Sequence, residues 1–141
     1  MFIHLRLHTE FSVVDGTARI DDAVASAAAD GQPALAITDI ANLFGAVKFY
    51  KAARGKGVKP ILGAEVALRG LAADPATVSR VLLLAQNEQG YLNLCELLAR
   101  AWTQGVTKAQ AVAEWDWLAE LASGLILLSG AAAGPVGQYL L

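Results

Sequence analysis

The sequence has little of the chemistry that builds disulfide bonds and thiolate metal sites. Its 141 residues include one cysteine, one methionine, two histidines and four prolines. A single cysteine excludes an internal disulfide bond and a zinc site made of cysteines. It also suits a reducing compartment, so we expect a cytoplasmic protein.

Positive charge and long apolar runs are scarce as well. There are 11 Lys and Arg against 13 Asp and Glu, which gives a net charge of −2. A chain with this net charge is a poor candidate for binding nucleic acid by itself. No run approaches the roughly 20 apolar residues that span a bilayer. Arg6 and His8 interrupt the apolar stretch at the N-terminus, so we expect neither a signal peptide nor a membrane association.

What the chain has in excess is hydrophobicity. Apolar residues make up 55% of it, and its mean hydropathy is +0.44, which is high for a small soluble domain. Alanine accounts for part of this excess. We expect another part to be surface that something outside this chain covers. Uncovered, that surface favours self-association of the fragment.

Strand and helix patterns alternate along the chain. The predicted strands are about 2–8, 34–38, 58–68, 78–85 and 125–129. The predicted helices are about 19–30, 46–54, 115–122, a long one that follows the N-cap Asn87 and runs to 104, and a last one that Pro135 can start. Alternation of this kind predicts an α/β fold of about five parallel β/α units with right-handed crossovers.

The predicted helix at 46–54 carries several lysines and arginines. Its pattern predicts that Val47 and Tyr50 face inward and that Lys48, Lys51 and Arg54 lie nearer solvent. With Lys56 and Lys59 these cations form a modest basic cluster. A solvated helix face explains the cluster at least as well as a contact with DNA does.

Polar side chains gather in the first sixteen residues and at the ends of the predicted strands. Alternation along 2–8 would place Arg6 between two histidines on one face. His8, Asp15, Asp39 and Glu65 have the side chains of a metal site, imidazole plus carboxylates. The alternative is that strand ends are polar because they meet solvent. Arg6 weakens the metal interpretation, because a guanidinium repels a cation and can pair with a carboxylate.

Several segments are similar to those of a known family. They are HLRLHTEFSVVDG (4–16), ALAITDIANLFG (34–45), KPILGAE (59–65), LLLAQNEQGYLNL (82–94) and GLILLSG (124–130). In order, and over essentially the whole chain, they resemble the N-terminal PHP (polymerase and histidinol phosphatase) domain of the bacterial replicative, C-family DNA polymerase III alpha subunits. The resemblance implies a distorted seven-stranded β/α barrel, of which residues 1–141 form the N-terminal part of a single, incomplete domain.

In other members of that family the barrel holds several metal ions and hydrolyses phosphoesters. The ligand positions that this sequence keeps are His8, Asp15, Asp39 and Glu65. The positions that depart from the family pattern are Arg6, Ile40, Arg80 and Ala131. Two of the departures are to arginine, which brings a fixed positive charge to a place that a cation would occupy. The resemblance therefore implies a degenerate metal site in which these ligands are vestigial, and no cofactor.

The implied role is a segment of a DNA polymerase III alpha subunit in chromosomal DNA replication. The parent protein would be a DNA-directed DNA polymerase (a nucleotidyltransferase), whose polymerase carboxylates lie in later domains, so this segment would be non-catalytic. It would support the polymerase and dock the proofreading exonuclease subunit, and it would meet DNA only through the holoenzyme.

Two other functions remain open. The first is a phosphoesterase or 3′–5′ exonuclease that uses His8, Asp15, Asp39 and Glu65 with Zn, Mn or Mg. The second is a complete small β/α domain unrelated to replication. Measuring how much metal the protein binds distinguishes the metal-dependent enzyme from a structural role.

Overall fold

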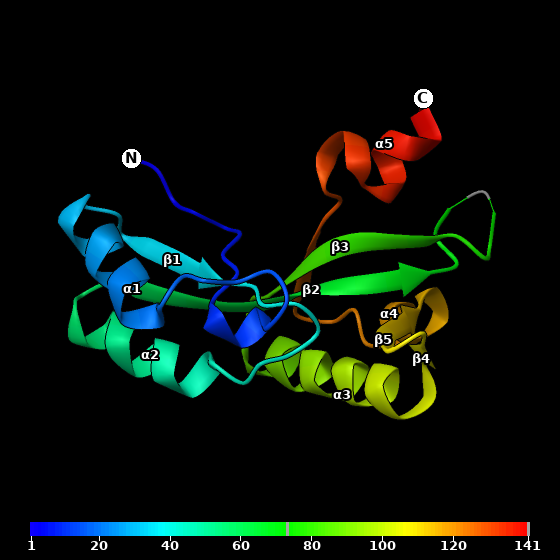
Figure 1. Ribbon diagram of the computed structural model, residues 1–141, viewed down its shortest axis with the longest axis horizontal. Helices are drawn as coiled ribbons and strands as arrows, with labels where there is room; N and C mark the ends of the chain where they lie inside the picture. The colour runs from blue at the N-terminus through cyan, green and yellow to red at the C-terminus, as the bar shows by residue number, and fades with distance from the viewer. Residues whose placement is uncertain (73, 141) are drawn as a thin grey trace. The chain divides into compact units, whose positions relative to one another are not determined.

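The computed structural model describes residues 1–72 and 74–140, which form two units, Met1–Ala64 and Glu65–Leu141. Figure 1 traces both units. Residue 73 falls between the predicted strands at 58–68 and 78–85, and residue 141 ends the segment that follows Pro135. These two residues lie outside the described part of the chain.

Unit 1 is built on a short parallel strand pair. Its elements are η1 (Glu10–Ser12), α1 (Ile20–Ala29), β1 (Ala34–Ile37), α2 (Ala46–Gly55) and the first part of β2 (Lys59–Arg69). β1 runs parallel to β2, with Ala34 beside Lys59 and Ile37 beside Leu62. The predicted ranges of α1, β1, α2 and β2 are confirmed to within one residue at each end.

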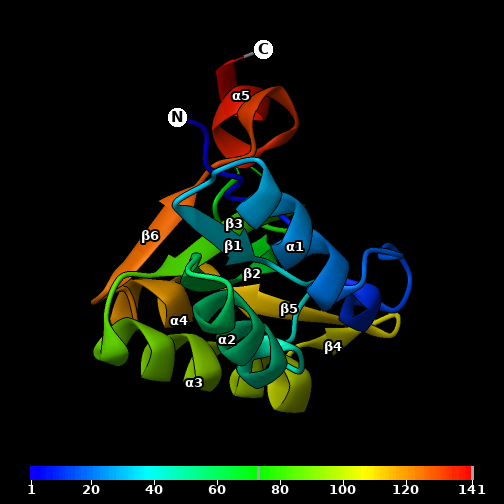
Figure 2. The same cartoon turned by 90° about the vertical axis from the view of Figure 1, so that its left-hand side faces the viewer.

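The core of unit 1 lies between β1 and its two helices, which are seen side by side in Figures 1 and 2. Its buried members are Ile20, Val24, Ala27, Leu35, Ile37, Phe49, Ala53 and Val58. All of β1 is buried, as its continuous apolar sequence predicts. Burial of these side chains is the main force that holds α1 and α2 in place.

The predicted first strand is wrong in detail. Residues 2–8 run extended beside β1, where the Ala36 N–H donates to the His4 carbonyl at 3.0 Å and the Thr38 N–H donates to the Leu7 carbonyl at 2.9 Å. The acceptors His4 and Leu7 are three residues apart, whereas the donors Ala36 and Thr38 are two residues apart. The register between the two segments therefore shifts by one residue between these hydrogen bonds. The Leu7 N–H donates to the Thr38 hydroxyl at 2.8 Å instead of to a carbonyl. A regular ladder with strict alternation is therefore lost.

The inward face predicted for α2 is also wrong. Val47 and Tyr50 are 65% and 48% exposed, whereas Phe49 is fully buried. Ala46 and Ala53 are buried beside it. Spacings of three and four residues put these three side chains on one helix face, one position away from the face we expected.

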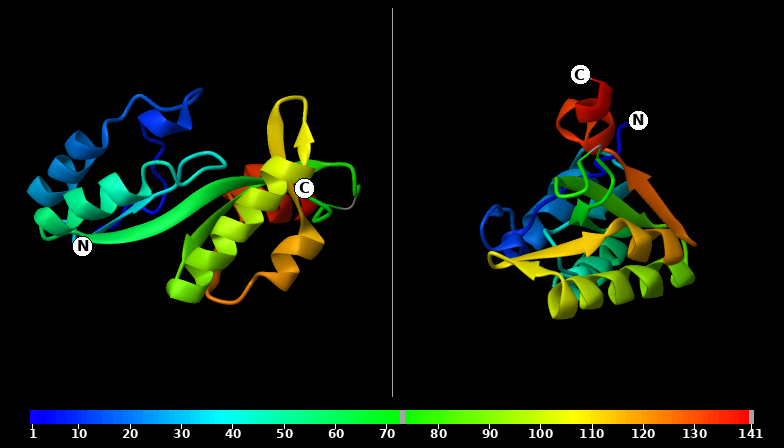
Figure 3. Two further views of the ribbon diagram at one scale, coloured as in Figure 1. Left: turned by 90° about the horizontal axis from the view of Figure 1, so that it is seen from below. Right: turned by 90° about the vertical axis from the view of Figure 1, so that its right-hand side faces the viewer.

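Unit 2 contains the rest of the sheet. Its further elements are β3 (Val78–Ala85), α3 (Glu88–Gln104), β4 (Val106–Thr107), β5 (Gln110–Glu114), α4 (Trp115–Glu120), β6 (Leu125–Leu128), η2 (Ala131–Ala133) and α5 (Pro135–Leu140). The strand order is β4-β5-β2-β3-β6. Helix α3, which Figure 3 shows from below, contacts β3 and β5. The predicted N-cap is confirmed, since Asn87 Oδ1 accepts the Gly90 N–H at 2.9 Å.

The prediction of about five parallel units is wrong in unit 2. β5 runs parallel to β2, but β6 runs antiparallel to β3 and β4 runs antiparallel to β5. The hairpin β4-β5 was not predicted, and it takes the place beside β2. The next strand of the chain, β6, lies at the opposite edge of the sheet, next to β3. The coarser prediction of a mixed α/β fold is confirmed.

An exposed ion-pair cluster joins α3 to α4. Arg100 Nη1 donates to Glu120 Oε2 at 2.8 Å, and Arg100 Nε donates to Glu96 Oε1 at 2.9 Å. The hydrogen bond from Arg100, together with its charge, lowers the pKa of Glu120 below its usual value. A carboxyl whose pKa is lower in the folded state stabilises the fold above its unfolded-state pKa. That contribution is lost as pH falls through the folded-state pKa.

We therefore expect Arg100→Met to return the pKa of Glu120 toward its ordinary value. A carbon-detected NMR titration of the side-chain carboxyl between acid and neutral pH measures this shift. Lys108→Met removes one positive charge elsewhere and is the matched control. An unchanged Glu120 titration in Arg100→Met would contradict the assignment.

Among residues 1–72 and 74–140, no helix combines the length and the apolar content that crossing a membrane requires.

Candidate functional site

The predicted site residues are divided between the two units. His8, Asp15 and Asp39 belong to unit 1, and Glu65 is the first residue of unit 2.

Asp39 follows β1 and is 1% exposed. Its carboxylate accepts three hydrogen bonds from the turn after the N-terminal segment. The Thr9 N–H donates to Oδ1 at 2.5 Å, the Thr9 hydroxyl donates to Oδ2 at 2.7 Å, and the Ser12 hydroxyl donates to Oδ1 at 2.6 Å. Hydrogen bonds from protein donors compensate a buried carboxylate for the water it has lost. We call Thr9, Ser12 and Asp39 the Asp39 cluster.

The loops that carry the Asp39 cluster are tied together around it. The Ile40 N–H donates to the Ser12 hydroxyl oxygen at 3.2 Å. Asn42 Nδ2 donates to the Phe11 carbonyl at 2.9 Å, and Asn42 Oδ1 accepts the Phe44 N–H at 3.1 Å. Side chains thereby satisfy the backbone groups of two irregular loops, which have no sheet ladder to do so.

His8 and Asp15 contact each other. Nδ1 of His8 lies 3.1 Å from Oδ2 of Asp15, and the two side chains are 11% and 62% exposed. When this nitrogen carries a proton, it donates to the carboxylate. Two predicted metal ligands therefore pair with one another at the outer end of the turn.

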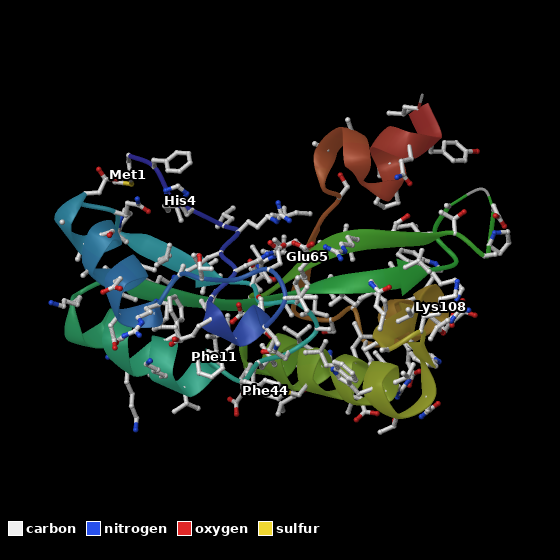
Figure 4. The ribbon with its side chains drawn as sticks, viewed as in Figure 1. Met1, His4, Phe11, Phe44, Glu65 and Lys108 are labelled. Atoms are coloured by element: carbon white, nitrogen blue, oxygen red, sulfur yellow. The ribbon has the colours of Figure 1, made fainter. Side chains whose placement is uncertain are left out.

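Glu65 lies in β2 and is 5% exposed. Arg80, which is on β3 and half exposed, places Nη1 3.5 Å from Glu65 Oε1. Figure 4 labels Glu65 at the start of the unit 2 part of β2. One of the arginines that depart from the family pattern thus pairs with one of the carboxylates that the pattern keeps.

The other departing positions differ in exposure and in backbone conformation. Arg6 is exposed, and Ile40 is half-buried. Ala131 begins η2 with a φ of 54°. Within either unit, counting only described residues, no three His, Cys, Asp or Glu side chains are grouped so as to hold a metal ion.

Two residues of the Asp39 cluster were not predicted to matter. Thr9 and Ser12 donate the three hydrogen bonds to Asp39 that are described above. A signal for them exists in the sequence, because Thr and Ser three apart after an extended segment favour side-chain capping of a tight turn.

The sequence profile of the PHP domain family matches residues 4–141. Curated relatives include DNA polymerase III subunit alpha of Pseudomonas aeruginosa, 48% identical over 140 residues, and of Escherichia coli K12, 48% identical over 141 residues. The subunit of Vibrio cholerae is 46% identical over 140 residues. Each match covers 99% of this chain and 12% of the relative, so the chain spans about an eighth of their length.

Two solved structures have a similar fold. One is an amidohydrolase from Chromobacterium violaceum, with a TM-score of 0.54 and 22% identity. The other, from Bifidobacterium adolescentis, is described as a metal-dependent phosphoesterase, with a TM-score of 0.50 and 21% identity. Each match covers 70% of this chain and 32% of the other. At this identity the likeness concerns the fold alone.

Proposed function

This chain belongs to the PHP domain family, and on that premise we propose that it is the N-terminal part of the PHP domain of a bacterial DNA polymerase III alpha subunit. Identity of 48% over 99% of the chain to alpha subunits of two genera supports this assignment. Residues 1–141 then form part of one seven-stranded barrel domain, and the parent protein is a cytoplasmic, DNA-directed DNA polymerase that acts in chromosomal replication.

The segment's own role is structural, and its metal site is degenerate. The Asp39 cluster carries this proposal: a buried carboxylate that accepts three hydrogen bonds from Thr9 and Ser12 is committed to holding two loops together. Three of the roughly four acceptor sites of the Asp39 carboxylate are occupied, so only Oδ2 has a lone pair left for a cation, and any further ligation would leave donors buried and unpaired. That exchange is costly.

The other kept ligands do not fit a cluster of divalent cations either. His8 and Asp15 are paired with each other, and a guanidinium lies beside Glu65. A fixed positive charge at that carboxylate opposes a second cation there. The proposed role therefore includes no metal-dependent step.

As part of a polymerase, the segment has two protein partners. One is the remainder of the alpha subunit, which would cover apolar surface such as Ile126 and Leu127 of β6, 44% and 37% exposed. The other is the proofreading exonuclease subunit, which docks on the PHP domain. DNA is contacted through the assembled holoenzyme, in keeping with the chain's net charge of −2.

Metal content tests the structural role. The 141-residue chain is incubated with Zn²⁺ or Mn²⁺, dialysed and analysed by plasma mass spectrometry. We expect far less than one ion per chain, a melting temperature that neither metal raises, and no hydrolysis of p-nitrophenyl phosphate above the metal-only rate. Ligand binding to the native state would raise the melting temperature by mass action.

His8→Ala is the decisive variant, and His4→Ala, which removes the chain's other histidine, is its control. Stoichiometric metal that is lost in His8→Ala and kept in His4→Ala would overturn the structural role. It would establish the alternative, a metal-dependent phosphoesterase or 3′–5′ exonuclease built on His8, Asp15, Asp39 and Glu65.

A further inference from the structure

Unit 2 contains a cavity of about 230 Å³, partly open to solvent, between the end of β2 and the β4-β5 hairpin. We call it the hairpin cavity. Apolar side chains form part of its wall, among them Val78 of β3 and Val112 of β5. Its polar wall is formed by Arg69, Thr107, Lys108 and Gln110. Among the described residues of the lining, none is a metal-ligand candidate discussed above, so the cavity is a separate feature.

The β4-β5 hairpin brings three of the polar side chains together. Thr107 and Gln110 are paired across the two strands, so their side chains lie on the same side of the hairpin. Lys108 lies in the turn between them, where Figure 4 labels it. A hydroxyl, an ammonium and a side-chain amide are all hydrogen-bond donors. The hairpin therefore supplies one wall of the cavity with donors from three neighbouring side chains.

Arg69 ends β2 and supplies a fourth donor. It is paired in register with Glu114 of β5, and its Nη2 lies 2.9 Å from Oε1 of Glu114. Its Nε is shut off from solvent, and among the residues that the structure describes no atom accepts a hydrogen bond from this N–H. Buried donors in folded proteins nearly always have an acceptor. Because Arg69 also lines the hairpin cavity, a ligand oxygen there can supply that acceptor.

The charge of the lining is positive. Arg69 and Lys108 each carry one positive charge, and none of the described lining residues is acidic. Glu114, beside the cavity, balances one of the two charges. Asp74, in the loop after β2, is exposed, and its carboxylate accepts hydrogen bonds from that same loop. An anion in the hairpin cavity would therefore be attracted by the cation that Glu114 leaves unbalanced.

The size of the hairpin cavity limits what it can hold. Cavities that enclose a whole small molecule have volumes of roughly 300 Å³ or more. At about 230 Å³, this one suits a single polar group whose carrier stays outside. A phosphate offers three strong acceptor oxygens, whereas a carboxylate has only two oxygens to share among four donor side chains. Arginine is also well suited to phosphate, because its N–H groups match the spacing of the phosphate oxygens.

We propose that the hairpin cavity binds the phosphate group of a phosphate monoester. Arg69 and Lys108 provide the opposite charge, and Thr107 and Gln110 add hydrogen bonds. A free nucleotide and the 5′ end of a nucleic acid strand both carry such a group. This inference goes beyond the proposed structural role and does not depend on it.

Titration of the ¹⁵N-labelled 141-residue chain with inorganic phosphate, followed by NMR, tests the proposal. The Nε–H signal of Arg69 and the backbone amide signals of Thr107 and Gln110 should shift and reach saturation. Sodium chloride at the same ionic strength should not shift them, because screening by salt is not specific to one site. Sodium acetate should bind at least about tenfold more weakly, since it offers fewer acceptor oxygens.

Two variants remove one contact each. Lys108→Met should weaken phosphate binding about tenfold, as the loss of one charge-assisted hydrogen bond does. Arg69→Lys keeps the positive charge beside Glu114 but lacks the Nε–H, and it should weaken binding by a similar factor. Lys51→Met removes an exposed charge of unit 1 and is the matched control, with an expected change of less than twofold. Circular dichroism should show the same fold in all three variants.

The proposal is wrong if phosphate leaves the three signals unchanged, or if it binds the wild type and Lys108→Met equally well. It is also wrong if acetate binds as tightly as phosphate. Thymidine monophosphate and 5′-phosphorylated oligothymidine then identify the carrier, because the true carrier should bind more tightly than inorganic phosphate and lose affinity in Lys108→Met. Equally tight binding of oligothymidine without a terminal phosphate would mean that the cavity holds a phosphodiester, which contradicts the monoester.

Discussion

Replacing Asp39 by alanine should lower the free energy of unfolding by about 3–5 kcal/mol, since three buried donors lose a charged acceptor. The donors are the Thr9 N–H, the Thr9 hydroxyl and the Ser12 hydroxyl, at 2.5 to 2.7 Å. The carboxylate is 1% exposed, so water does not replace it without opening both loops. Urea unfolding followed by circular dichroism measures the change.

The isosteric Asp39→Asn variant is the control for this experiment. Its side-chain oxygen can still accept from the Thr9 N–H and the Ser12 hydroxyl, while its amide meets the Thr9 hydroxyl, which can rotate and accept. We expect a smaller loss of about 1–2 kcal/mol, the difference between a charged and a neutral acceptor. Equal losses in the two variants would contradict the role assigned to the individual hydrogen bonds. An Asp39→Ala variant as stable as wild type would show that Asp39 is free to serve as a ligand.

The parts of the fold that could be predicted are those whose signal is local. The apolar run of β1 and the Asn87 cap of α3 each specify an element through neighbouring residues alone. The direction in which a strand pairs is not local. β6 has the same continuous apolar sequence that a parallel strand would have, yet it runs antiparallel to β3.

The sequence contains almost no pattern that predicts the hairpin β4-β5. Its turn is made by Lys108 and Ala109, which have φ values of 51° and 63°. Turns of this left-handed kind are usually recognised by Asn or Gly, and neither is present at these two positions. Its longer strand contains the short apolar run Ala111 to Ala113, too brief to be told from part of a helix.

For the candidate site, the sequence predicted which polar residues lie near the strand ends, but not with which residue each of them forms a hydrogen bond or an ion pair. Asp39 and Asp15 were assigned the same role as ligands. Asp39 is buried and accepts hydrogen bonds from Thr9 and Ser12, whereas Asp15 is largely exposed beside His8. The difference depends on the slip in pairing after His4, which sets where the turn meets β1. A one-residue change of register is invisible to alternation rules, because they assume a regular strand.

Gly16 is the residue whose enlargement should most disturb the Asp39 cluster after Asp39 itself. A Cβ at Gly16 would lie 1.8 Å from the Thr9 carbonyl oxygen and 3.2 Å from the Ser12 Cβ. Real Cβ contacts are never as short as 1.8 Å, so the backbone of Thr9 must move, and with it the two hydrogen bonds that Thr9 donates to Asp39. Gly16→Ala should therefore lower the free energy of unfolding by about 2–3 kcal/mol, as overpacking does.

Gly55→Ala controls for the loss of a glycine as such. Gly55 ends α2, and nothing lies within 4 Å of its Cβ position, so alanine there should be neutral or stabilising by a few tenths of a kcal/mol. The double variant Gly16→Ala/Asp39→Ala, also measured by urea unfolding, then distinguishes a shared cause from two separate ones. If both changes break the same hydrogen bonds, the double variant loses clearly less stability than the sum of the single losses, because bonds already broken cannot be lost twice. Additive losses would mean that Gly16 acts on the turn independently of Asp39.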